Sequence, residues 1–185
     1  LYYYNYKNLI IQSYDISAPF NAAFNGSKIG IRGGQVDVLA RLSSRDDLSL
    51  NVGYSRSRNQ DVTDPFTGKS YDGLSPPYSP DYTAQLGYTR SIPVGVAEVR
   101  AHIDWRFEGS WYADYVHNKG TEQVASNKGY ASLIYDATRW SAGLWVKNIT
   151  NRATIGAAGA AGLPGPATAF LNDPRTFGAR VAFKY

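Results

Sequence analysis

The sequence predicts an all-β chain of antiparallel strands that belong to a transmembrane β-barrel. Apolar and polar residues alternate with a period of two along most of the 185 residues, which is the spacing of the two faces of a strand. The segments between these strands are alternately short and long, as in outer-membrane barrels with short periplasmic turns and longer extracellular loops. Aromatic residues stand near the ends of the apolar faces, where barrels carry aromatic girdles.

Eight strands are expected, and the chain order of turns and loops makes each one antiparallel to the next. The first strand is the least regular, and the pair Gly33-Gly34 in the second strand suggests a bulge. The expected strands cover about 2–11, 28–42, 47–60, 81–92, 96–110, 128–136, 139–149 and 175–185. Short connections are expected near 43–46, 93–95 and 137–138, and long ones at roughly 12–27, 61–80, 111–127 and 150–174.

The strand expected at 96–110 shows the alternation most clearly. Its apolar face would contact lipid, and its opposite face carries charges of both signs, which can line a wet lumen or meet a plug. Metal-ligand spacing is missing from the polar face, so we expect neither a metal site nor a catalytic site there. The apolar face comprises Val99, Ala101, Ile103, Trp105 and Phe107; the predicted lumen wall comprises Arg100, His102, Asp104, Arg106 and Glu108.

Composition narrows the functional classes. The chain has no Cys, so it has neither disulfides nor a Cys-based metal site. Its net charge of +4 comes from scattered single residues, without the basic patch that nucleic-acid binding requires, so we expect no nucleic-acid partner. No nucleophile, base and orienting group stand together, which indicates a protein that is not an enzyme and uses no cofactor.

One long connection contains a cluster of residues that could touch a small-molecule ligand. The cluster could equally pack the loop, and the pattern leaves both readings open. Its members are Trp111, Tyr112, Tyr115 and His117.

The end of the chain carries a recognisable pair of motifs. Residues 140–152 read Trp-Ser-Ala-Gly-Leu-Trp-Val-Lys-Asn-Ile-Thr-Asn-Arg, and residues 173–185 read Asp-Pro-Arg-Thr-Phe-Gly-Ala-Arg-Val-Ala-Phe-Lys-Tyr. They resemble the "V-x-N-L-x-D/N" and "P-R-T-x-G" segments of TonB-dependent receptors of the bacterial outer membrane. Looser matches lie at 74–82 and at 30–38, where Gln35 stands in place of a common Glu.

The resemblance implies a barrel of about 22 strands with a plug in its lumen. It implies active uptake of a scarce ligand, such as siderophore-iron, cobalamin or an oligosaccharide, energised by the TonB complex. Residues 1–185 would then be the C-terminal part of the barrel domain, with the plug domain and the TonB box absent from this chain. The resemblance also implies that Phe183 and Tyr185 act as an assembly signal. The implied partners are outer-membrane lipid, the remainder of the barrel with its plug, TonB and the ligand.

Two other readings stay open at this level. Eight strands are enough for a complete small outer-membrane barrel with a structural, adhesive or small-solute role. A soluble β-sandwich binding module would also show alternation, with its apolar faces turned inward.

Overall fold

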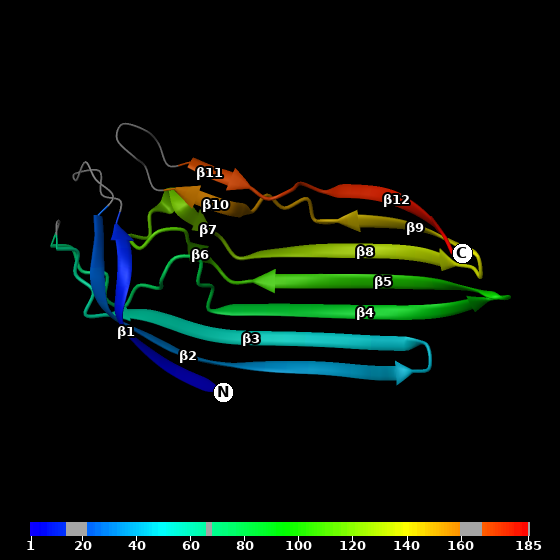
Figure 1. Ribbon diagram of the computed structural model, residues 1–185, viewed down its shortest axis with the longest axis horizontal. Coiled ribbons are helices and arrows are strands. Elements are labelled where there is room, and N and C mark those ends of the chain that lie inside the picture. The colour runs from blue at the N-terminus through cyan, green and yellow to red at the C-terminus, as the bar shows by residue number, and fades with distance from the viewer. Residues whose placement is uncertain (14–21, 66–67, 160–167, 185) are drawn as a thin grey trace.

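The computed structural model describes residues 1–13, 22–65, 68–159 and 168–184, and its main feature is one curved antiparallel sheet (Figure 1). Eight strands follow one another through the sheet in chain order, which confirms the expected number and direction. They are β1 (Tyr2–Ser13), β2 (Ala22–Ser43), β3 (Asp46–Gln60), β4 (Tyr82–Val94), β5 (Ala97–Glu108), β8 (Ser126–Asp136), β9 (Trp140–Lys147) and β12 (Thr176–Phe183).

The connections between strands also alternate as expected. All the long ones gather at one end of the sheet, and the short turns at 44–45, 95–96 and 137–139 lie at the other (Figure 1). We call these the loop end and the turn end. One expectation was wrong: the long connection at 12–27 is shorter, because β1 and β2 stay paired up to Ser13 and Ala22. Residues 14–21 lie outside the described residues.

Two small hairpins fold within the long connections, where no strands were expected. The first joins β6 (Trp111–Tyr112) to β7 (Glu122–Gln123) and contains the 3-10 turn η1 (Lys119–Thr121). The second pairs β10 (Ile155–Gly159) with β11 (Thr168–Leu171). Neither shows a long two-residue alternation, since strands of two to five residues are too short for that signal.

The bulge expected at Gly33-Gly34 is absent. The register of β2 against β3 runs without interruption through both glycines, and shifts instead between Arg41 and Ser43. A side chain at Gly33 would collide with the Tyr2 phenol and with the carbonyl oxygen of Tyr54. Glycine is therefore needed here because the ring of Tyr2 lies over the backbone, and not because an extra residue is inserted.

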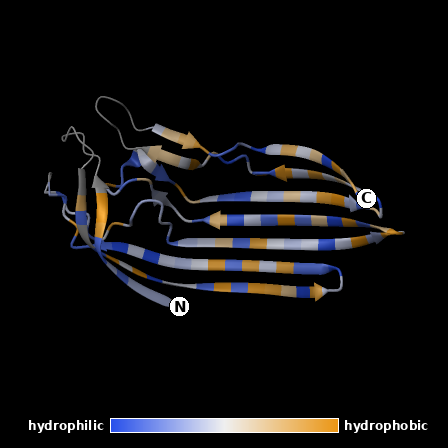
Figure 2. Cartoon of the chain, viewed as in Figure 1, coloured by the Kyte–Doolittle hydropathy of each residue, from blue (hydrophilic) through white to orange (hydrophobic). Residues whose placement is uncertain are grey.

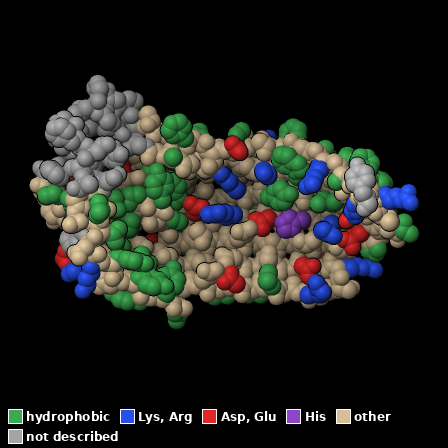
Figure 3. All heavy atoms as spheres, viewed as in Figure 1, with side chains coloured by type: hydrophobic (Ala, Val, Ile, Leu, Met, Phe, Trp, Pro, Cys, Tyr) green, Lys and Arg blue, Asp and Glu red, His purple; other side chains and the backbone are tan. Residues whose placement is uncertain are grey.

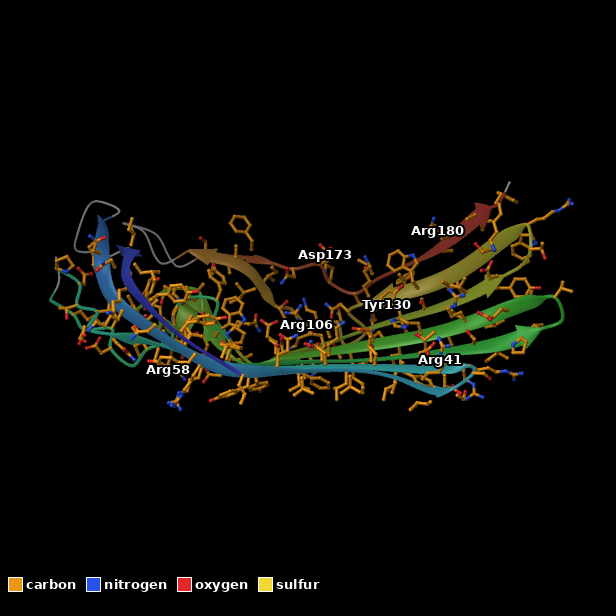
Figure 4. The ribbon with its side chains drawn as sticks, turned by 60° about the horizontal axis from the view of Figure 1, so that its bottom comes forward. Arg41, Arg58, Arg106, Tyr130, Asp173 and Arg180 are labelled. Atoms are coloured by element: carbon orange, nitrogen blue, oxygen red, sulfur yellow. The ribbon has the colours of Figure 1, made fainter. Side chains whose placement is uncertain are left out.

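The two faces of the sheet differ sharply. Apolar and polar residues alternate along each strand (Figure 2), and the apolar set projects from the convex side of the sheet (Figure 4). In mid-strand, side chains of this set are well exposed, among them Leu86 at 43%, Leu133 at 50% and Leu144 at 63%. Aromatics stand on the same face at both ends: Tyr54, Tyr82 and Phe107 toward the loops, and Tyr88, Tyr135, Trp140 and Phe183 toward the turns.

Very little of the described chain is a conventional core. Within residues 1–13, 22–65, 68–159 and 168–184, one cluster of buried apolar side chains occurs at the loop end: Ile11, Val62 and Tyr71, with Phe24 and Leu74 packed against it. No second sheet covers the convex face in the part of the chain that the structure describes. A β-sandwich hides such a face against another sheet, so that alternative does not fit. An exposed apolar face of this extent requires contact with lipid or another apolar partner.

The sheet is open. Within the described ranges, β1 and β12 are its two edges, and each pairs on one side only. A complete eight-stranded barrel would join these two strands, so the small-barrel alternative does not fit either. In the same ranges, no helix has the length and apolarity of a membrane span.

Candidate ligand-binding site

A cavity of about 460 Å³ lies where the concave face of the sheet meets the loops. We call it the loop-end cavity. Its walls come from the loop ends of β5, β8, β9 and β12, and both small hairpins border it. Figure 3 shows charged side chains gathered along the hollow of this face. The cavity is lined by Arg106, Glu108, Trp111, Gln123, Ser126, Lys128, Lys147, Asn148, Thr154, Ile155, Asn172, Asp173, Pro174 and Thr176.

Three cations meet on one wall of this cavity. Arg106 stands opposite Lys128 across β5 and β8, and Lys147 lies two strands from Arg106, opposite Tyr130. Arg106 donates to Glu108 over 3.0 Å, whereas Lys147 lies 5.4 Å above the ring of Trp145. For Lys128 and Lys147 the structure shows no ion pair within the described ranges. The three cations of the lining outnumber its two carboxylates, Glu108 and Asp173, so the cavity favours an anionic ligand.

The hairpins around the cavity are fastened to the wall and to each other. The indole nitrogen of Trp111 donates to Glu108 over 2.7 Å, and its ring packs 4.9 Å from that of Tyr78. The side-chain oxygen of Gln123 accepts from the backbone nitrogen of Ile155 over 2.6 Å, which joins β7 to β10. One charge-assisted and one neutral hydrogen bond, both partly buried, thus hold the cavity lining in place.

Asn148 organises the floor of the cavity. Its amide nitrogen donates to the carbonyl oxygens of Arg152 and Asp173 over 3.0 and 3.1 Å, and its oxygen accepts from the backbone of Arg152. Its φ of 51° is left-handed, which Asn tolerates better than most residues. Asn151, with φ of 50°, accepts from the backbone nitrogen of Arg175. These bonds tie the end of β9 to the start of β12, and they connect the two motifs seen in the sequence.

The structure brings one of the four predicted ligand residues to the cavity. Trp111 lines it, whereas Tyr112 stacks on His117 at 4.1 Å and the His117 ring nitrogen Nε2 lies 3.0 Å from the carbonyl oxygen of Ser75. Tyr115 packs against the buried loop cluster, and burial raises the pKa of its phenol. Ligand contact by these residues stays a prediction, and the geometry favours Trp111 among them.

The predicted lumen wall lies on the concave face. Arg106, like Tyr130 and Arg180, rises from this side of the sheet (Figure 4). Its neighbours form a hydrogen-bonded ladder across strands: Gln85 donates to Asp104 over 2.9 Å, and the His102 nitrogen Nδ1 lies 2.8 Å from the Thr89 hydroxyl. Arg100 pairs with Glu98 at 3.2 Å. Among the described residues, no group of three metal-binding side chains occurs, at His102 or elsewhere.

Sequence reasoning missed several cavity residues that lie far apart in the chain. Lys128 and Lys147 belong to the polar faces of β8 and β9, so extending the alternation of β5 to those strands would have placed them on the same side as Arg106. No sequence signal placed Gln123 or Asn172, which reach the cavity through the hairpins.

Comparisons with known proteins show the fold. No protein-family model matches the chain, and no curated protein matches it in sequence. Among solved structures, the ferric yersiniabactin uptake receptor FyuA from Yersinia pestis aligns over 97% of this chain with 19% identity and a TM-score of 0.80. The siderophore receptor PiuA from Acinetobacter baumannii aligns over 99% with 17% identity and a TM-score of 0.74. BauA, the ferric preacinetobactin receptor of the same species, aligns over 94% with 16% identity and a TM-score of 0.66.

The chain spans about a quarter of the length of these receptors, namely 26%, 25% and 25%. It therefore has the fold of one part of such a receptor. The open eight-stranded sheet agrees with this, since its edges are unpaired in the described residues.

Proposed function

We propose that this chain forms part of the barrel wall of a TonB-dependent outer-membrane receptor, and that the loop-end cavity belongs to the path of an anionic ferric siderophore. The single observation that carries the ligand class is the pair of Lys128 and Lys147 beside Arg106 in that cavity. Two structures with the same fold are named as a ferric yersiniabactin uptake receptor and a siderophore receptor, and this supports the proposal.

The membrane location is supported by the convex face. Between Leu48 and Tyr54, a strand advances roughly 20 Å, most of the apolar band about 25 Å tall of an outer-membrane barrel. Aromatic side chains on this face flank the band at both ends. Lipid cannot satisfy backbone N–H and C=O groups, so the open edges at β1 and β12 require further strands. A barrel of about 22 strands meets that requirement.

The concave face supports the remaining partners of the proposal. Its ladder of mixed charges and amides suits a surface covered by water or by a folded plug. We propose contact with a plug along this wall, and coupling to TonB through the plug. Transport then needs no catalytic residue, in keeping with a receptor and not an enzyme.

The test uses the full-length receptor expressed in cells that lack their own siderophore receptors. Uptake of radioactive iron is measured with catecholate, hydroxamate and carboxylate siderophores, with and without TonB. The double variant Lys128→Gln/Lys147→Gln should weaken binding of an anionic chelate at least about tenfold, since charge-assisted contacts are the strong ones. The control Arg180→Gln removes a cation from the same face outside the cavity and should change binding little.

Two results would contradict the proposal. Uptake that persists without TonB would exclude this transport mechanism. TonB-dependent uptake of cobalamin or an oligosaccharide, with no ferric chelate bound, would keep the mechanism and reject the ligand class.

A further inference from the structure

A second group of cations lies on the opposite, convex face of the sheet, near the loop end. Arg32 of β2 and Arg56 of β3 stand directly opposite each other in the register. With Arg58, Tyr3 and Gln60 they line a pocket of about 330 Å³. We call this the outer arginine site. It is separate from the loop-end cavity, because the arginines alternate with the concave-face residues of the same strands.

The described part of the chain balances the charges of this site only in part, since Asp81 pairs with Arg58 and also lies within electrostatic range of Arg56. Arg58 is held by Asp81, with contacts of 2.9 and 2.7 Å, and Lys28 by Asp61 at 2.9 Å. The structure shows no ion pair for Arg32 or Arg56 within the described ranges, and both are exposed. Like charges directly opposite each other destabilise a sheet, so this arrangement is expected where an anion bridges them.

The position of the site limits what that anion can be. Along β3, Tyr54 is the last aromatic residue at the loop end of the apolar band. Arg56 follows it by two residues on the same face, a distance of roughly 7 Å. Along β2, Arg32 lies on the loop side of the apolar residues Val36 and Val38, and Gly34 stands between Arg32 and Val36 on the same face. Cations immediately beyond the apolar band stand at the depth of lipid headgroups. Figure 4 shows Arg58 projecting on this convex side.

The donors match a phosphate group. Two guanidinium groups present planar forks that bind phosphate oxygens in pairs, and Tyr3, 67% exposed across from Arg32, adds a hydroxyl. Gly30 lies beside Arg32 on the same face and leaves its space to the side chain of Gln60. The site therefore offers several donors around one open pocket.

We propose that the outer arginine site binds the phosphorylated headgroup of a membrane lipid in the leaflet next to the loops. The inference rests on the proposed membrane location of the sheet, and not on the proposed siderophore. The lipid chains would lie along the apolar band below Tyr54, while Arg32 and Arg56 hold the phosphate and Arg58 is kept in place by Asp81.

The experiment uses the full-length receptor, extracted from its own membrane in mild detergent. Native mass spectrometry measures binding of diphosphorylated lipid A and of the same lipid after removal of its phosphates. A further measurement tests whether inorganic phosphate competes with lipid A. The variant Arg32→Gln/Arg56→Gln should lower lipid A binding at least about tenfold, and Arg32→Lys/Arg56→Lys should lower it less, because lysine keeps the charge and loses the fork. The control Arg45→Gln/Arg139→Gln removes two exposed cations at the turn end and should bind as the unaltered receptor does.

Each outcome decides the proposal. Loss of lipid A binding in the Gln variant but not in the control, with weak binding of the dephosphorylated lipid, supports it. Undiminished binding in the Gln variant, equal loss in the control, or full competition by an equal concentration of inorganic phosphate overturns it. Heat-modifiable migration confirms that each variant is folded. Iron uptake by the Gln variant should be unchanged, so failure here is distinguishable from failure of the transport proposal.

Discussion

At the scale of single residues, Asn148 combines two demands that few side chains meet. It adopts a left-handed backbone conformation, and its amide group is buried with hydrogen bonds to Arg152 and Asp173. The sequence motif around it resembles a family pattern, and the structure supplies the physical reason for an Asn at this position.

Replacing Asn148 should therefore destabilise the floor of the loop-end cavity. We expect Asn148→Ala to cost about 1–3 kcal/mol, because buried backbone carbonyls lose their donors and Ala strains at positive φ. Asn148→Gly tolerates the backbone conformation, so it isolates the hydrogen-bond contribution and should cost less. The measurement is urea unfolding of the receptor in detergent micelles, followed by tryptophan fluorescence. If both variants were as stable as the unaltered protein, the stabilising role of the Asn148 hydrogen bonds would be refuted.

Phe183 stands at the turn end of the convex face and is 71% exposed. Tyr185 lies outside the described residues, so its role as an assembly signal stays a prediction. We expect that deleting Tyr185, or changing Phe183 and Tyr185 to Asp, lowers the amount of folded protein in the outer membrane, since interface depth favours aromatic rings. Uptake per folded molecule should change little. Surface-exposed protein and iron uptake are measured in the same cells. Normal assembly with lost uptake would show that these two residues do not face lipid.

At the scale of elements, β5 separates its two faces most clearly. Trp105 lies over Gly129 on the convex face, whereas Arg106 and Glu108 reach the loop-end cavity on the other. The facing expected from the alternation of 99–108 agrees with this geometry. The proposed function adds that the convex face contacts lipid and the concave face lines the lumen.

Spin labels on β5 test those surroundings. These 185 residues contain no Cys, so each single-Cys variant introduces the one thiol of this part of the receptor. Labels at Ala101 and Ile103 should be accessible to oxygen dissolved in lipid, and labels at Arg100 and Asp104 to a water-soluble relaxation agent. The neighbouring positions serve as matched controls for one another. Reversed accessibilities would mean that the register of β5 relative to the membrane is wrong.

At the scale of the whole molecule, the open sheet is the dominant feature. Each unpaired backbone group at its edges costs several kcal/mol in lipid. We expect that the isolated 185-residue chain, refolded in detergent, does not give the compact, heat-modifiable monomer that marks a closed barrel. Co-refolding with the remaining strands of the receptor should restore that behaviour. A heat-modifiable monomer of the chain alone would favour the small-barrel reading.

The sequence by itself determined the strand number, the antiparallel order and the assignment of faces, because a period of two specifies which side chains share a side. It also indicated which connections are long. The tertiary structure decided how the strands close or stay open, how the long connections fold, and which polar residues meet on one face. The open edges, the hairpins β6–β7 and β10–β11, and the meeting of Arg106, Lys128 and Lys147 depend on cross-strand register and on loop contacts. Local periodicity shows neither the register nor the loop contacts, because each joins residues that lie far apart in the chain.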